Sequence, residues 1–235
     1  MSNKAEMTIL EHLDELRQRL LKIVIALLVG VVLGTFVTQP ALKLLVAPLG
    51  GEMEVIAISP TEAPAVFFKV AIVIGVVIAM PVIMYQLFRF AAPGLEPLER
   101  RYIMIGAPVA SLSFAIGVVF AALVLLPSAL PFLQGFLADI VKQQYSIEKY
   151  ISFVSNILIW AGIVFETPLV MFFLAKLGVV SASGFAKARR IVIVAAAAGA
   201  AVITPTVDPV NMLLVMMPFL VLYEVGILLA KLARP

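Results

Sequence analysis

Uninterrupted apolar runs constrain this chain more than any other feature of its sequence. The stretch Val70–Phe88, for example, contains no charged residue, and 63% of the 235 residues are apolar while only 13% are charged. Soluble domains are about half apolar and a quarter charged, so the excess apolar surface has to face lipid. A β-barrel strand would alternate apolar and polar residues over about 10 positions, which these runs do not do. The sequence therefore predicts an all-α integral membrane protein.

Charge-free stretches, and the prolines that interrupt them, predict six transmembrane helices in a single membrane domain covering residues 1–235. A helix needs roughly 20 mostly apolar residues to cross the hydrocarbon core. The third helix is expected to end near Leu126, with an apolar loop after it, because Pro127 and Pro131 interrupt the run. The predicted spans cover residues about 20–38, 66–90, 102–126, 150–175, 191–203 and 210–230.

The last two of these helices are expected to be short. Residues 191–207 would reach only about 25 Å at about 1.5 Å per residue, against a hydrocarbon core of about 30 Å. Either the bilayer thins locally, or this pair is tucked against longer helices.

The distribution of basic residues predicts the orientation of the chain. Of the 17 Lys and Arg residues, 13 lie in the N-terminal segment, in the 2–3 and 4–5 connections or in the C-terminal tail. Because Lys and Arg accumulate on the cytoplasmic side, both termini are expected in the cytoplasm. We interpret the net charge of +3 as anchoring to anionic lipid, and not as a sign of a nucleic-acid partner.

Residue types for catalysis or metal binding are scarce. The chain has no Cys, which excludes disulfides, thiolate metal sites and Cys nucleophiles. Its one histidine, His12, forms an H-x-x-E pair with Glu15, and two candidate ligands make a poor metal site. No glycine-rich phosphate loop, zinc motif or nucleotide fingerprint occurs. We therefore expect no enzyme activity, no metal and no cofactor.

The N-terminal segment has the pattern of an amphipathic helix at the membrane surface. Thr8 and Glu11 form a capping box, and apolar residues then recur at helical spacing, which predicts a helix over residues 8–20. Glu15 projects from its polar side. Judged on these residues alone, the favoured interpretation is a simple i,i+4 pair between Glu15 and Arg19.

A second acidic group lies in the connection between the second and third spans. Glu99 is followed by Arg100 and Arg101, which can neutralise it, and an acidic residue also suits the start of a helix. The alternative is that Glu99 and Glu15 belong to one cytoplasmic surface of carboxylates that binds a basic peptide. Composition alone does not choose between these alternatives.

Glu166 is the one charged residue inside the predicted fourth span. An ionised group at that depth costs about 2.5–3.5 kcal/mol on insertion scales, so we favour a functional role, facing a partner, a water-filled groove or a proton path. The alternative is a protonated or snorkelling Glu that hydrogen-bonds across helices, helped by Pro168, which frees a carbonyl in the preceding turn.

Three further sequence patterns give weaker predictions, one about helix packing, one about a short segment after the first span and one about an acidic residue in the sixth span. Gly30-x-x-x-Gly34 would let another helix approach closely, although the motif is common in membrane helices. Residues 42–48 fit a short interfacial helix or, almost equally, an apolar loop. Glu224 lies within two turns of Lys231 and is expected to snorkel to the interface.

Several motifs, in order along the chain from about Thr8 to Leu232, resemble the TatC family. That family is the six-span subunit of the twin-arginine (Sec-independent) protein translocase. The motifs are His12-Leu-Asp-Glu-Leu-Arg-Gln-Arg-Leu20, Ser59-Pro-Thr-Glu62, Pro81-Val-Ile-Met-Tyr-Gln86, Glu99-Arg-Arg101, Phe165-Glu-Thr-Pro168 and Tyr223-Glu224.

The resemblance implies a receptor for twin-arginine signal peptides, in a machine of the bacterial or archaeal cytoplasmic (inner) membrane that moves folded proteins using the proton-motive force. It implies that Glu15 and Glu99 bind the paired arginines at the cytoplasmic face, with Arg17 in the same N-terminal motif. Guanidinium and carboxylate groups pair bidentately, so the chemistry fits. It also implies a cupped, glove-like bundle whose concave face is lined by Glu166.

The resemblance further implies partners. The single-span subunits TatA and TatB would dock near the fifth and sixth helices, at or beside Thr204, Thr206 and Met212, and a receptor complex could contain several copies of this chain. In some relatives a glutamine early in the sixth helix serves this docking, and Met212 stands there in this chain.

The main rival from another class is a proton-coupled secondary transporter that uses Glu166 as its relay. Such a transporter predicts a substrate site near the midplane and, in many folds, inverted repeats. Neither is visible in the sequence.

Overall fold

Helices make up the regular structure of the computed structural model, which describes residues 9–50, 55–91, 97–135, 139–140, 144–203 and 209–233. One isolated backbone bridge, between Ile56 and Ser146, is the exception within those ranges. Five helical stretches there are long and apolar enough to cross a membrane: Leu10–Leu49, Glu62–Phe90, Ile105–Gly135, Ile147–Lys176 and Met212–Leu232. The prediction of an all-α membrane protein is confirmed, whereas the sixth predicted span, 191–203, stays a prediction.

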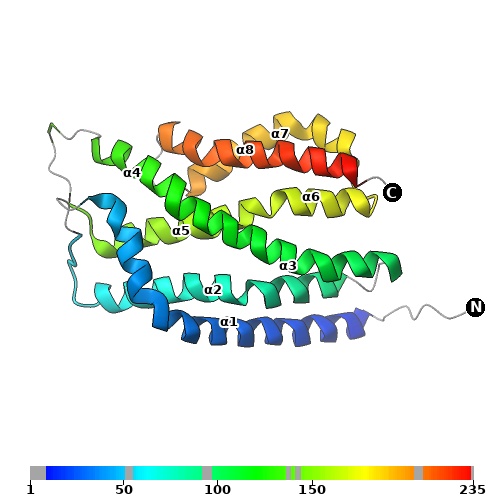
Figure 1. Cartoon of the computed structure of the whole chain (residues 1–235), viewed down its shortest axis with the longest axis horizontal. Coiled ribbons are helices and arrows are strands. Elements are labelled where there is room, and N and C mark those ends of the chain that lie inside the picture. The colour runs from blue at the N-terminus through cyan, green and yellow to red at the C-terminus, as the bar shows by residue number, and fades with distance from the viewer. Residues whose placement is uncertain are drawn as a thin grey trace, which may run out of the picture.

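The first helix, α1 (Ile9–Val46), is longer than expected and unbroken. The surface helix predicted over 8–20 and the first span at 20–38 belong to one continuous helix, because no Gly or Pro interrupts the residues that join them and each added residue gains a backbone hydrogen bond. Pro40 lies inside α1, and Figure 1 shows the helix bending sharply towards its C-terminal end. A 3₁₀ turn, Ala47–Leu49, follows, so 42–48 is helical and not a loop.

Glycines bring α1 into close contact with α2 (Glu62–Ala91). A Cβ atom added at Gly30 would lie 2.4 Å from the carbonyl oxygen of Gly75, and one added at Gly34 would lie 2.6 Å from that of Ala71. Both obstacles are backbone atoms, so they cannot rotate away. The weak packing signal of Gly30-x-x-x-Gly34 is therefore confirmed, and Gly75 completes the contact from the other helix.

The third helix corrects one prediction. It does not end near Leu126, because α3 (Pro97–Phe120) continues through a π-helical segment, Ala121–Leu125, into α4 (Leu126–Gly135). In the π segment the Leu126 N–H donates to the Ala121 carbonyl, five residues back. This shift in the hydrogen-bond register immediately precedes Pro127, whose missing N–H would otherwise interrupt the ladder, so the helix passes through the proline.

The predicted fourth span is divided in two at Glu166. It consists of α5 (Ile147–Phe165) and α6 (Thr167–Lys176), and Pro168 lies in the first turn of α6. The last two helices are α7 (Ala182–Ile203) and α8 (Pro209–Leu232). The first half of α7 carries Lys187, Arg189 and Arg190, so its charge-free part is short, as the sequence predicts.

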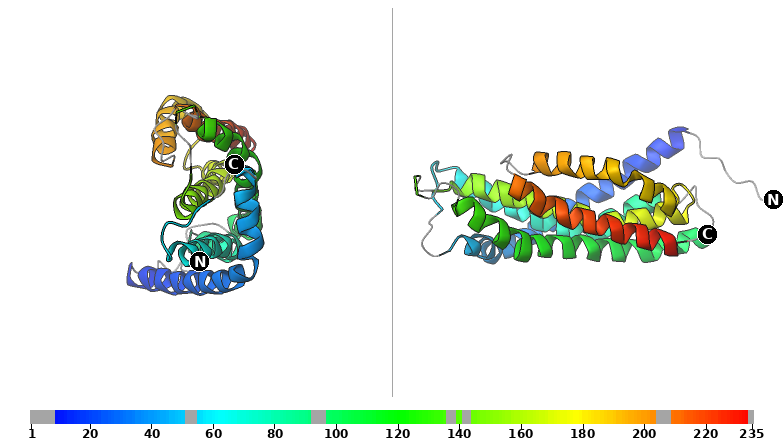
Figure 2. Two further views of the ribbon diagram at one scale, coloured as in Figure 1. Left: turned by 90° about the vertical axis from the view of Figure 1, so that its left-hand side faces the viewer. Right: turned by 90° about the horizontal axis from the view of Figure 1, so that it is seen from above.

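The helices form a curved layer that is open on one side, with α1 and α7 at opposite ends of the curve (Figure 2). The start of α1, the end of α2, the start of α3 and the end of α8 lie together at one end of the bundle (Figure 1), which we call the terminal end. The opposite, or far, end carries the C-terminal part of α1, together with α4 and the start of α5.

Hydrogen bonds tie the far end together. The Tyr150 hydroxyl on α5 donates to the Leu45 carbonyl on α1 at 2.6 Å. The Ser146 hydroxyl, at the N-cap of α5, donates to a carboxylate oxygen of Glu62 at 3.0 Å, and both residues are buried. Ile56 bonds backbone to backbone with Tyr145 and Ile147. The far end is thus fixed by contacts between segments that are distant in sequence.

Candidate functional site at the terminal end

Glu15 is held in place by two helices. Arg19, one turn further along α1, donates from Nε and Nη2 to Glu15 Oε1, and from Nη1 to Gln86 Oε1 on α2 at 3.3 Å. The predicted Glu15–Arg19 pair is therefore confirmed. Glu15 Oε2, however, is buried and has no hydrogen-bond partner among the described residues. One oxygen of the carboxylate accepts hydrogen bonds from Arg19, and the other has no donor among the described residues.

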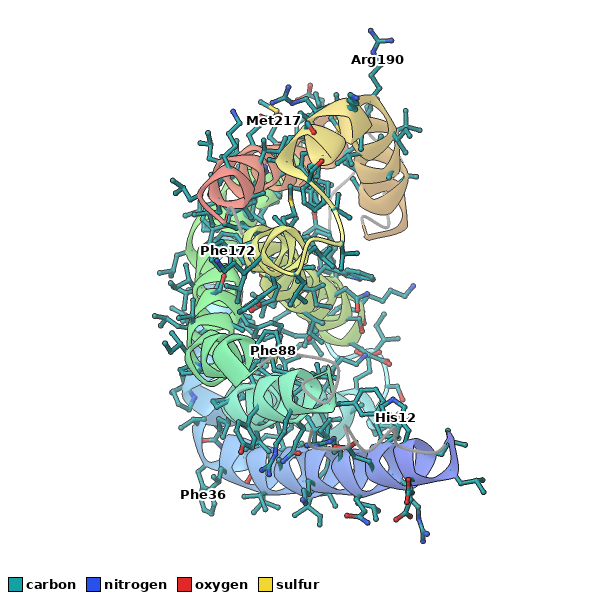
Figure 3. The ribbon with its side chains drawn as sticks, turned by 90° about the vertical axis from the view of Figure 1, so that its right-hand side faces the viewer. His12, Phe36, Phe88, Phe172, Arg190 and Met217 are labelled. Carbon is teal, nitrogen blue, oxygen red and sulfur yellow. The ribbon has the colours of Figure 1, made fainter. Side chains whose placement is uncertain are left out.

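His12 and Phe90 form the neighbouring part of this cluster. Their rings stack with centroids 4.5 Å apart and an interplanar angle of 16°, and His12 Nδ1 lies 3.8 Å from Glu15 Oε2. Figure 3 shows His12 on α1 next to the end of α2. No role was predicted for Gln86 or Phe90 from the sequence. Gln86 could have been noticed as a polar residue near the end of an apolar span. Nothing in the sequence around Phe90 indicates that it contacts His12.

The other predicted binding residues lie at the same end of the bundle. Arg17 is exposed on α1, and Glu99 lies in the first turn of α3, where an acidic residue suits the helix dipole. The structure describes the backbone of Glu99 but not its side chain. The distance between the Glu15 and Glu99 carboxylates is therefore not defined. What the fold brings together is the start of α1 and the start of α3 (Figure 1).

Glu166 lies between α5 and α6 and is buried, with a relative exposure of 7%. Its Oε1 has no hydrogen-bond partner in the described residues. The carbonyl of Phe165, just before it, accepts a hydrogen bond from the Ser113 hydroxyl of α3 at 2.7 Å. Phe165 also lines a small apolar cleft together with Trp160 and Pro218. The acid is therefore buried within the single chain, where an unpaired polar atom costs free energy.

Glu224 does not simply snorkel to the interface. Its two carboxylate oxygens accept hydrogen bonds from Arg189 Nε at 2.6 Å and Arg189 Nη2 at 2.7 Å, so α7 and α8 are joined by a bidentate pair. The hydrogen bond to Glu224 also raises the pKa of the Arg189 guanidinium. This pair was not predicted from the sequence, because the two residues are far apart along the chain.

Of the three predicted docking residues, the structure describes only Met212. Thr204 and Thr206 lie outside the described residues, and Met212, in the first turns of α8, is half-buried. Their role stays a prediction.

The sequence of this chain is similar to those of known translocase proteins. The family description "Sec-independent protein translocase protein (TatC)" matches residues 11–218. The protein of that name from Carboxydothermus hydrogenoformans is 38% identical over 97% of this chain and 95% of its own length, and the one from Aquifex aeolicus is 37% identical over 97% and 96%. The chloroplast protein of Pisum sativum is 34% identical over 97% of this chain and 65% of its own.

Solved structures agree with the sequence comparison. A crystal structure of the twin-arginine translocase receptor TatC is 38% identical, covers 95% of this chain and 99% of that chain, and has a TM-score of 0.84. A second crystal structure of that receptor, in the detergent DDM, is 37% identical, covers 94% and 100%, and has a TM-score of 0.86.

Proposed function

We propose, from the premise that this chain belongs to the TatC family of Sec-independent protein translocase proteins, that it is the signal-peptide receptor of such a translocase. The comparisons support a translocase role and not the proton-coupled transporter based on Glu166. The family consists of translocase subunits and not of enzymes. In this proposal the cargo is folded protein, and transport is driven by the proton-motive force.

The binding site proposed for the signal peptide is the terminal end, with Glu15 as its principal residue. The observation that carries the proposal is the buried, unpartnered Oε2 of Glu15. A guanidinium group from a signal peptide would supply the missing donor and a charge-assisted hydrogen bond. Because Arg19 already occupies Oε1, an incoming arginine would bind Oε2 alone. Glu99, at the start of α3, would bind the second arginine of the pair, with Arg17 nearby.

The proposed orientation puts the terminal end in the cytoplasm and the chain in the cytoplasmic (inner) membrane. The described residues at that end include Arg17, Arg19, Arg89, Lys187 and Lys231. Such an accumulation of cations supports a cytoplasmic location. In this orientation both termini are cytoplasmic, and α7 is the short fifth of six spans.

The proposed partners are the single-span subunits TatA and TatB, which would dock near α7 and α8, and further copies of this chain in the receptor complex. The apolar residues exposed on α7 support this, since Ile191 is 74% and Val194 69% exposed. Glu166 is proposed as the polar site of the concave face. Its buried, unpartnered oxygen supports a role that needs a further donor, from a partner or a water molecule.

Binding of a synthetic twin-arginine peptide to the purified protein tests the receptor site. Removing one carboxylate that makes a charge-assisted contact should cost about 1.5–3 kcal/mol, or roughly ten- to a hundred-fold in affinity. We therefore expect Glu15→Ala and Glu99→Ala each to weaken binding by that factor. Asp14→Ala is the matched control, because Asp14 is acidic and adjacent, but its carboxylate accepts a hydrogen bond from Gln18. Unchanged affinity in the Glu15→Ala/Glu99→Ala double variant, with thermal stability intact, would contradict the assignment.

A further inference from the structure

The Arg189–Glu224 pair is the strongest side-chain connection between α7 and α8 in the described part of the chain. Its two parallel hydrogen bonds, 2.6 Å and 2.7 Å long, join a guanidinium fork to both oxygens of one carboxylate. A bidentate arrangement of this kind fixes relative orientation as well as distance. A point contact between two long side chains would fix distance alone.

A second contact lies one turn away on α7. The hydroxyl of Tyr223, the residue before Glu224, donates to the Phe185 carbonyl at 2.8 Å, and Tyr223 is buried. Two consecutive residues of α8 therefore bind α7 at two levels separated by one helical turn. Two such anchors define both the axial register and the rotation of α7.

Apolar packing of α7 against the bundle is concentrated near these two anchors, where Phe185 and Val192 pack against the cluster of Met171, Tyr223 and Ile227. Further along α7 the buried residues are small, Ala196 and Ala200, and a Cβ added at Gly199 would meet no atom within 4 Å. Helices interlock when ridges of side chains enter grooves. Alanine and glycine offer shallow ridges, so the second half of α7 resists a change in rotation less than the part around Phe185 and Val192 does. The directional hydrogen bonds of the two anchors, together with the packing beside them, therefore select one rotation.

We propose that Arg189 and Glu224 are a positioning pair that sets the rotation of α7, and thereby the residues which α7 presents outward. With the observed rotation, Ile191, Val194, Ala195 and Ala198 are exposed, at the spacing i, i+3, i+4 and i+7 of one helical face. This inference rests on the proposed docking of single-span partners near α7 and α8. A rotated α7 would present a different set of residues to the partner.

Distance measurement between two spin labels tests the pair without a partner. The chain has no native Cys, so Val194→Cys on α7 and Leu228→Cys on α8, which are 69% and 58% exposed, provide a labelled background. Arg189→Gln and Glu224→Gln should each shift or broaden the distance distribution. Because both remove the same interaction, the double variant should be no worse than either single one.

Arg190→Gln is the matched control. Arg190 is the next residue along α7 and carries the same charge, but Figure 3 shows its side chain pointing away from the bundle. Its distance distribution should equal that of the labelled parent. Arg189→Lys keeps the charge and loses the fork, so it should give a smaller change in the same direction, and it replaces Arg189→Gln if that variant does not fold. A distribution that is unchanged in Arg189→Gln, Arg189→Lys and Glu224→Gln would overturn the proposal.

Partner binding is the second readout, measured at a temperature at which all variants are fully folded. Affinity for the single-span partner should fall at least about five-fold in Arg189→Gln and Glu224→Gln, and should not change in Arg190→Gln. A role restricted to stability would lower the melting temperature but leave this affinity unchanged, which would overturn the positioning role. If the unsubstituted chain binds no single-span partner, the docking proposal fails, while the spin-label distances still decide on the pair.

Discussion

The glycine contact between α1 and α2 allows one perturbation to be predicted from geometry. In Gly30→Ala the new Cβ would lie 2.4 Å from the Gly75 carbonyl oxygen, 3.2 Å from its carbonyl carbon and 3.3 Å from its Cα. An ordinary contact of this kind is 3.4–4 Å, so the two helices would have to separate by about 1 Å. They cannot do so locally, because all three atoms belong to the backbone of α2.

The expected cost follows from what holds membrane helices together. Apolar surface gains little by leaving lipid, so close packing supplies much of the association between α1 and α2. Overpacking a tight contact costs about 1–3 kcal/mol. The helix-propensity gain of Ala over Gly, about 1 kcal/mol at most, offsets only part of this cost. About 1–2 kcal/mol remains, so we expect Gly30→Ala to lower the melting temperature of the detergent-solubilised protein by about 2–8 °C.

Gly199→Ala is the internal comparison. Gly199 is also helical, but an added Cβ there would meet nothing within 4 Å, so the propensity gain should appear alone and stability should stay equal or rise. Gly75→Ala should resemble Gly30→Ala, since its Cβ would lie 2.7 Å from the Val31 nitrogen. If thermal unfolding gives Gly30→Ala the same melting temperature as Gly199→Ala, the contact does not have the energetic role argued here.

Three further outcomes are expected. Tyr150→Phe should cost about 1–2 kcal/mol in thermal unfolding, because the buried Leu45 carbonyl loses its donor; an unchanged melting temperature would contradict this. Glu166→Leu should keep or raise the melting temperature, because it removes a buried oxygen without a partner, while transport by reconstituted vesicles should fall. Unchanged transport, or loss of folding together with transport, would contradict this. In intact cells an impermeant thiol reagent should label Ile140→Cys, because this position beyond α4 is 80% exposed and is expected outside the cell. The same reagent should label Arg190→Cys only after lysis. The reverse pattern would show that the proposed orientation is inverted.

Much of the fold follows from patterns within single segments. Charge-free runs located the membrane helices, and Gly30-x-x-x-Gly34 indicated the contact with α2. The errors arose where a local rule was overridden by hydrogen bonding. Pro127 was expected to end a helix, but the π-helical segment before it shifts the backbone hydrogen bonds by one residue, so the helix continues through the proline. The polar segment before Leu20 was expected to form a separate surface helix, but helix propagation joins it to the first span.

The candidate site was predictable only in part, because its residues are joined across the chain. Glu15 and Arg19 are four residues apart, so their pairing could be read from helical spacing. The partner of Arg19 on α2, Gln86, is 67 residues away, and Glu224 is 35 residues from Arg189. Periodicity carries no information about which faces of two helices meet. Those contacts therefore had to come from the three-dimensional structure.

Glu166 shows how the two kinds of information combine. Pro168 has no N–H for the carbonyl four residues earlier, that of Val164, and the Glu166 N–H donates to that carbonyl instead. The next carbonyl, that of Phe165, accepts a hydrogen bond from the Ser113 hydroxyl of α3. The break between α5 and α6 is therefore stabilised from a neighbouring helix, and the backbone there needs nothing from the Glu166 side chain. Since the carboxyl is not required to satisfy this break, and its Oε1 is buried without a partner, helix geometry does not explain its presence. A donor from outside the chain would satisfy it, which is the physical basis for expecting its substitution to affect transport more than folding.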